Sequence, residues 1–196
     1  MFIDYLTLIM VNMVAGTVIL AYYLWKGIDE PNQRPYAPAF AGVGLLALIL
    51  GLQLSTSWPL PGSYNIAFGE PTALFGVVFL MAAASLSQGW DLVPVSIFAF
   101  FAGIDGLLVG IRILSLGLTQ EPLFSAVGFL LAGLGGIFTP PFFMFFRNNK
   151  IFRMLAIVVL LGTSAIWAFT FYSSLWGHLA SFAKWVPSTM VVPAPK

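Results

Sequence analysis

The stretch from Leu92 to Leu116 reads LVPVSIFAFFAGIDGLLVGIRILSL, and it decides the fold class. Only Asp105 and Arg112 are charged within it. A helix of roughly 20 apolar residues is long enough to cross the hydrocarbon core of a bilayer, which is about 30 Å thick. We therefore predict that this stretch is a transmembrane helix.

The whole chain has the composition of a membrane protein. It has 196 residues, of which 60% are hydrophobic and 8% charged, with a mean hydropathy of +0.97. A soluble domain of this length would need a far more charged surface. The net charge is +1 and no basic run exceeds two residues, which argues against a nucleic-acid partner. The absence of cysteine excludes disulfides and thiolate chemistry.

Short polar segments divide the chain into six apolar runs, and we predict that these form a single membrane domain over residues 1–196. The predicted spans cover residues 5–25, 37–54, 71–86, 92–116, 123–146 and 151–175. The fold class that follows is all-α: a polytopic membrane protein built as a six-transmembrane-helix bundle. Residues 55–70 form the longest predicted loop.

The basic residues predict the orientation in the cell membrane. Loops enriched in Lys and Arg stay on the cytoplasmic side. Such residues gather between spans one and two and between spans five and six, at Lys26, Arg34, Arg147, Lys150 and Arg153. Beyond the spans on the other side there are only Lys184 and Lys196, in the tail. We therefore expect both termini to lie outside the cytoplasm.

Asp105 and Arg112 are the candidate residues of a transport path. An ionisable group at membrane depth is costly and indicates a functional site unless a structural partner explains it. Asp105 lies near the middle of span four, and Arg112 follows two helical turns later on the same face. Asp105 would line a solute or proton path, with Arg112 at its outer mouth. The alternative is that Asp105 is paired or protonated and only fastens the bundle.

Small residues at four-residue spacing predict that spans four and five pack closely against each other, or that they meet a second protomer. The predicted ridges are Ala102, Gly106 and Gly110 on span four and Gly128, Ala132 and Gly136 on span five. Thr139, Pro140 and Pro141 predict a kink near the end of span five, because proline removes backbone hydrogen bonds.

Three polar residues of the long loop are candidates for an outer lid. Tyr64, Asn65 and Glu70 could cover the outer mouth of a path. The alternative is a packed connector with aromatic residues at the membrane interface.

The sequence argues against an enzyme and offers no metal or cofactor site. Its single histidine, His178, cannot supply bis-histidine haem ligation within one chain. No zinc-protease, nucleophile-elbow or phosphate-loop motif is present. Membrane lipid is the expected surrounding, with a homo-oligomer or a larger membrane complex as the expected assembly.

Two stretches resemble a known family. Tyr64 to Thr72 (YNIAFGEPT) and Leu118 to Pro122 (LTQEP) resemble the membrane protein family known as domain of unknown function 981, over nearly the whole chain. This resemblance implies a membrane topology and no particular activity.

A second, architectural resemblance is to the six-span urea and short-chain amide channels. Gly69 to Gly76 (GEPTALFG) and Gly89 to Pro94 (GWDLVP) are similar to helix starts of that family, with Val93 in place of an expected arginine. It implies six spans, termini outside and assembly as rings. The family's glutamates in spans five and six are missing here, where Thr139 to Pro141 and Gly162 to Ser164 stand, so urea specificity does not carry over.

These observations predict a narrow path for a small neutral or weakly polar solute. One alternative is a non-catalytic accessory or scaffold subunit of a larger membrane complex, and another is a lipid- or quinone-binding protein. Convergence of Asp105, Asn12, Gln53 and Ser85 on one cavity would favour the path.

Overall fold

The computed structural model describes residues 4–183, and their regular structure is entirely helical. The long helices are α1 (Tyr5–Trp25), α2 (Ala37–Ser57), α3 (Tyr64–Gln88), α4 (Val93–Leu116), α5 (Pro122–Pro141) and α6 (Lys150–Ser181). Short turns of 3₁₀-helix occupy Gly27–Asp29 (η1) and Arg34–Tyr36 (η2), and a π-helix (η3) covers Phe142–Phe146. Six helical segments in the described range are long and apolar enough to cross a membrane. The predicted fold class is confirmed: the chain is a six-span membrane protein.

The predicted long loop is mostly helical, which corrects the sequence interpretation. Helix α2 continues to Ser57 and α3 already begins at Tyr64, so the connector comprises only residues 58–63. Pro71 therefore lies inside α3 rather than at its start. Polar residues had suggested a loop here, but helices that extend beyond the hydrocarbon core tolerate them at their ends. Helix α6 likewise runs beyond the predicted span, to Ser181.

Glycines end two of the helices sharply. Gly89 and Gly117 have positive φ angles of 71° and 60° and follow α3 and α4. The N–H groups of Trp90 and Leu118 then donate to the carbonyls of Ser85 and Ile113, as in a Schellman motif. These turns make the reversals at both ends of the bundle short.

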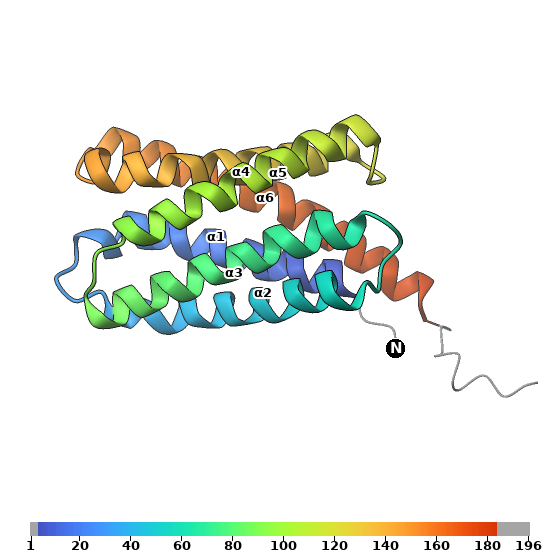
Figure 1. Ribbon diagram of the computed structural model, residues 1–196, viewed down its shortest axis with the longest axis horizontal. Coiled ribbons are helices and arrows are strands. Elements are labelled where there is room, and N and C mark those ends of the chain that lie inside the picture. Colours follow the sequence, from blue (N-terminus) through green and yellow to red (C-terminus); the bar gives the residue numbers. More distant parts are fainter. Residues whose placement is uncertain (1–3, 184–196) are drawn as a thin grey trace, which may run out of the picture.

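The six helices close a ring in which each contacts its neighbours in sequence and α6 returns to α1. The closest pairs are α2 with α3, α4 with α5, and α1 with α6. Figure 1 shows α1, α2 and α3 together, α4 and α5 across from them, and α6 crossing from one group towards the other. Stacked phenyl rings of Phe40, Phe75 and Phe79 fill the interior.

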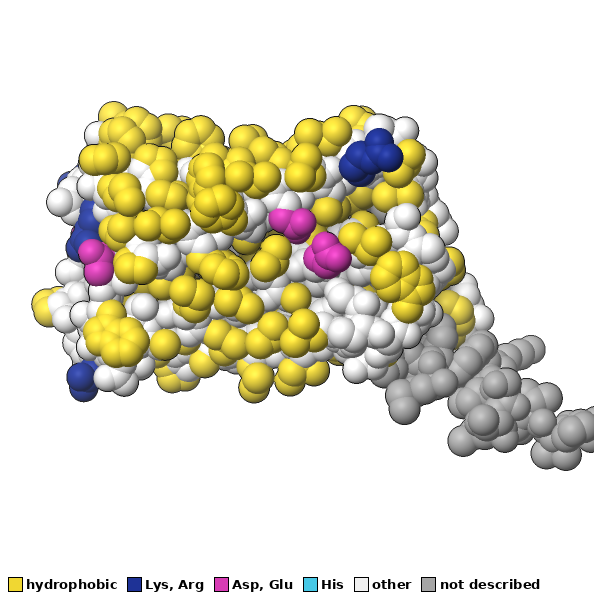
Figure 2. All heavy atoms as spheres, in the orientation of Figure 1, with side chains coloured by type: hydrophobic (Ala, Val, Ile, Leu, Met, Phe, Trp, Pro, Cys, Tyr) yellow, Lys and Arg dark blue, Asp and Glu magenta, His cyan; other side chains and the backbone are white. Residues whose placement is uncertain are grey.

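The connections separate into two ends of the bundle (Figure 1). One end consists of the connections after α1, α3 and α5, and we call it the basic end. These connections are residues 26–36, 89–92 and 142–149. The connectors after α2 and α4, the start of α1 and the end of α6 form the opposite end. Figure 2 shows Lys and Arg side chains at the basic end and a hydrophobic middle, as lipid requires. Lys184 and Lys196, used in the orientation prediction, lie outside the described residues.

Candidate functional site: a polar cavity at the basic end

A cavity of about 640 Å³ opens at the basic end. Its walls come from the last turns of α1 and α3, from η3 and from the connections between helices. The polar side chains that line it are Tyr23, Asn32, Gln33, Arg34, Ser85, Trp90, Asp91 and Arg147, and Ile28, Leu86, Leu92 and Phe143 are among its apolar residues. Polar and apolar side chains thus both line the cavity, and each kind comes from helix ends as well as from the connections.

The loop between α1 and α2 is held in shape by Gln33. The hydroxyl of Tyr23 donates to Gln33 Oε1 at 2.8 Å, and Gln33 Nε2 donates to the carbonyl of Ile28 at 3.2 Å. One residue earlier, Asn32 Oδ1 accepts from the backbone N–H of Arg34 at 3.2 Å. These bonds fix the wall of the cavity from which the Arg34 side chain extends.

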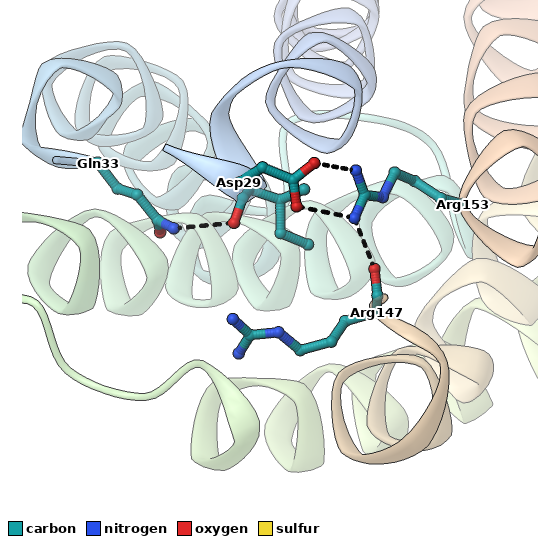
Figure 3. Close-up of polar contacts among 5 residues, drawn as sticks. Asp29, Gln33, Arg147 and Arg153 are labelled. Atoms are coloured by element: carbon teal, nitrogen blue, oxygen red, sulfur yellow. Dashed lines mark hydrogen bonds and ion pairs between the residues drawn. The ribbon is translucent and has the colours of Figure 1, made fainter. Parts of the chain in front are cut away.

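An ion pair joins this loop to the start of α6 (Figure 3). Arg153 Nη2 donates to Asp29 Oδ1 at 3.0 Å and to the carbonyl of Arg147 at 2.8 Å, while its Nη1 contacts Asp29 Oδ2. The bidentate geometry is the strong form of an Arg–carboxylate pair. Arg153 also binds the backbone of Arg147. It therefore holds Arg147 in place, and the Arg147 side chain is the second arginine of the cavity.

The pair makes Asp29 a stronger acid. The hydrogen bonds from Arg153 lower the pKa of Asp29 below its ordinary value of 3.8, and the charges of Arg153, Arg147 and Lys150 act in the same direction. A lowered folded-state pKa means that the pair stabilises the fold above the ordinary value and loses this contribution as pH falls through the folded value. The connection between loop and helix is therefore intact at neutral pH.

Two guanidinium groups face the cavity without a carboxylate partner. Arg34 and Arg147 line it, and neither forms an ion pair within residues 4–183. In Figure 3 the Arg147 side chain extends away from Arg153, and no hydrogen bond or ion pair joins its guanidinium to Asp29. Asp91, the acid among the lining residues, uses Oδ1 to accept from the N–H of Val93 at 3.0 Å. The arrangement leaves an excess of positive charge for an anionic ligand.

The residues predicted to line a path do not converge on this cavity. Asp105 is half-buried on α4, and Arg112 is exposed with a hydrogen bond to Ser115 of its own helix. Asn12 donates to the carbonyl of Val43 at 3.0 Å between α1 and α2, and Gln53 is exposed. Only Ser85 lines the cavity.

The predicted lid residues are parts of α3. Asn65 is completely buried and ties down the connector: its Oδ1 accepts from Leu60 N at 2.9 Å, and its Nδ2 donates to the carbonyls of Leu60 and Gly62. Tyr64 stacks on Phe68. Glu70 is exposed on the side of the bundle. Tyr64 and Asn65 form the start of α3 and Glu70 lies in its second turn; the contacts of Asn65 fit the packed-connector alternative.

Helices α4 and α5 pack closely through small residues, as predicted, but through partly different ones. A Cβ on Gly103 would lie 2.6 Å from the Gly133 carbonyl oxygen, and one on Gly136 would lie 2.7 Å from the carbonyl oxygen of Ala99. Gly106 and Gly110 also meet α5.

The other three predicted ridge residues lie elsewhere. A Cβ on Gly128 would meet the indole of Trp167 on α6, Ala132 packs against the cluster around Trp167, and Ala102 is only half-buried. Steps of four residues drift around a helix with 3.6 residues per turn, so the predicted ridges leave the interface.

Sequence reasoning had used Arg34 and Arg147 only to orient the chain and had missed their cavity. The available signal was that three predicted connections at one end carry arginines, amides and Trp90. Within residues 4–183 no group of three or more His, Asp or Glu side chains is placed to hold a metal ion.

Comparison with known proteins adds a family. The model of the family described as protein of unknown function (DUF981) matches residues 1–181. No curated protein and no solved structure matches the chain.

Proposed function

We propose a ligand-binding function for this chain, which belongs to the DUF981 family: its basic-end cavity binds the phosphate group of an anionic ligand, in the first place a phospholipid headgroup. The observation that carries the proposal is the pair of unpaired guanidinium groups, Arg34 and Arg147, in a polar cavity. Guanidinium binds phosphate oxygens through two parallel hydrogen bonds, which gives strength and orientation.

The position of the cavity favours a lipid as the source of the phosphate. It lies at the ends of the candidate membrane-spanning helices, where we expect the lipid headgroups. Basic pockets between helices on the cytoplasmic side are typical sites for anionic lipids. Leu86, Leu92 and Phe143, which also line the cavity, could contact glycerol and the first acyl carbons.

The test compares binding of two ligands to the purified full chain in a non-ionic detergent. Phosphatidylglycerol and sn-glycerol 3-phosphate present the same phosphate with and without acyl chains, and a thermal-unfolding shift reports binding. We expect phosphatidylglycerol to raise Tm. Arg34→Gln and Arg147→Gln should each weaken its binding about tenfold, because each removes charged hydrogen bonds.

Lys150→Gln is the matched control. Lys150 carries the same charge at the same end, and it does not line the cavity. This variant should bind as the unmodified chain does. Equal binding of sn-glycerol 3-phosphate would identify a soluble phosphate ester instead of a lipid. Binding of neither ligand, or equal losses in Lys150→Gln and Arg147→Gln, would contradict the proposal.

A solute path is the second candidate, because every second helical segment around the ring contributes to the wall of the cavity. Tyr23, Ser85 and Phe143 bring α1, α3 and η3 to its wall, so it sits where a path through the ring would open. The rings of Phe75 and Phe79 stack on each other in the helix core and are not among the residues that line the cavity. Asp105 and Arg112 are not among the residues that line this cavity, which is why this candidate ranks second. Solute-driven swelling of proteoliposomes no faster than that of empty liposomes would remove it.

A further inference from the structure

Acidic side chains lie at membrane depth on the outer face of α3 and α4. Glu70 is exposed and Asp105 is half-buried, and their carboxyl groups lie close enough for their charges to interact. Asp105 Oδ2 is buried and has no hydrogen-bond partner within residues 4–183. Figure 2 shows acidic side chains together in the middle of a hydrophobic face. Exposing these carboxyl groups to the acyl chains of lipids would cost free energy.

A basic group without a carboxylate partner lies on the same helix. Arg112 is exposed on α4, two turns beyond Asp105, and forms no ion pair within the described residues. Leu108 lies between them and is 58% exposed, so this strip of α4 is open along its length. One surface therefore carries both signs of charge, and neither is neutralised inside the chain.

Glu70 and Arg112 lie at similar depths. At a rise of 1.5 Å per residue, Glu70 is about 9 Å from the start of α3, and Arg112 is about 6 Å from the end of α4. Both helix ends belong to the opposite end of the bundle. Asp105 is deeper, at about 16 Å. A long arginine side chain covers a difference of a few ångströms in depth.

We propose that a second copy of this chain covers this face and that Arg112 of each copy pairs with Glu70 of the other. Copies inserted in the same orientation are related by an axis along the membrane normal, which preserves depth. A twofold axis of this kind makes one surface self-complementary, because each contact occurs twice. The contact neutralises Glu70, brings a positive charge near Asp105, and removes all these groups from lipid.

Cysteine cross-linking in native membranes tests the contact, since the chain contains no cysteine of its own. Leu108→Cys should form a disulfide-linked dimer under mild oxidation because Leu108 lies at the centre of the proposed face. Val158→Cys is the matched control: Val158 is 61% exposed, but on α6. It should cross-link no more than random collision produces. A cross-link of Leu108→Cys to a protein of different mass would overturn the proposal.

Charge reversal tests the pairing itself. In the Leu108→Cys background, Arg112→Glu should reduce cross-linking and raise the dimer dissociation constant in detergent at least about tenfold, because it opposes like charges. The double variant Arg112→Glu with Glu70→Arg should restore both. If Arg112→Glu does not fold, the proposal is still tested by comparing the cross-linking of Leu108→Cys with and without Arg112→Gln. Cross-linking of Leu108→Cys no greater than that of Val158→Cys, or insensitive to Arg112, would overturn the proposal.

Discussion

Thr139 compensates for a proline inside a membrane helix. Pro140 has no N–H and cannot complete the helical bond to the carbonyl of Gly136. The hydroxyl of Thr139 donates to that carbonyl and also contacts the carbonyl of Gly135 at 3.2 Å. The helix nevertheless changes to a π-helix directly after Pro141. Where a kink was predicted, the structure thus shows a change of helix type, and the carbonyl that Pro140 leaves without a backbone donor is satisfied locally, as lipid demands.

Replacing this hydroxyl should therefore destabilise the chain. Thr139→Val keeps the side-chain shape and leaves the Gly136 carbonyl without its donor, which should lower the free energy of unfolding by about 1–3 kcal/mol. Unfolding in mixed micelles with increasing SDS measures the difference. The control is Thr56→Val: the hydroxyl of Thr56 donates to the Leu52 carbonyl, in a part of α2 without proline. A loss for Thr139→Val no larger than for Thr56→Val would contradict this role.

At the scale of elements, two hairpins repeat one packing geometry. In α2 and α3, a Cβ on Gly44 would meet the Gly76 carbonyl, and one on Gly76 would meet the backbone of Leu48. In α4 and α5, a Cβ on Gly103 would likewise meet the Gly133 carbonyl, and a Cβ on Gly133 would meet the backbone of Leu107. Close backbone approach through small residues is the usual means of helix association in lipid, where hydrophobic association is weak.

Gly133 and Gly135 allow a paired test of this approach. Gly133→Ala would place a Cβ 2.7 Å from the backbone nitrogen of Leu107, so α4 and α5 must separate, and we expect a loss of about 1–3 kcal/mol in unfolding free energy. A Cβ on Gly135 meets nothing within 4 Å.

Gly135→Ala should therefore be neutral or stabilising by up to about 1 kcal/mol, because alanine favours the helix. The same SDS titration measures both variants. Equal effects of the two substitutions would show that the α4–α5 contact is not limited by backbone approach.

The helices were predictable from sequence, but their faces and the cavity were not. Six spans follow from hydropathy alone, because each must exceed the thickness of a bilayer. The identity of the close-packed residues depends on helix rotation, so the central Gly103 and Gly133 were missed. The cavity joins Arg34 and Arg147, more than a hundred residues apart, and only tertiary structure brings such residues together. Asp105 was recognised as unusual, yet its half-buried position on α4, away from the cavity, was not evident.

At the scale of the whole molecule, the ends of the chain complete the ring as a third helix pair. Thr17 on α1 and Ser164 on α6 share a hydrogen bond of 2.6 Å between their hydroxyls. Near the opposite end, His178 Nδ1 lies 2.6 Å from Asp4 Oδ2. Both contacts join residues far apart in sequence. The ring thus consists of the α2–α3 and α4–α5 hairpins and of a pair closed by side-chain hydrogen bonds.

The orientation of this ring decides which compartment supplies the ligand of the cavity. Single cysteines can report it, at Ser63 and Gln120 in connectors of the opposite end and at Asn148 in a connector of the basic end. All three positions are exposed. An impermeant maleimide applied to intact cells should label Ser63→Cys and Gln120→Cys, whereas Asn148→Cys should react only after permeabilisation. The physical reason is the group of arginines and lysines beside Asn148 and in the neighbouring loop, which disfavours translocation of that end. Labelling of Asn148→Cys in intact cells would place Arg34 and Arg147 outside, and the ligand would then come from the outer leaflet or the medium.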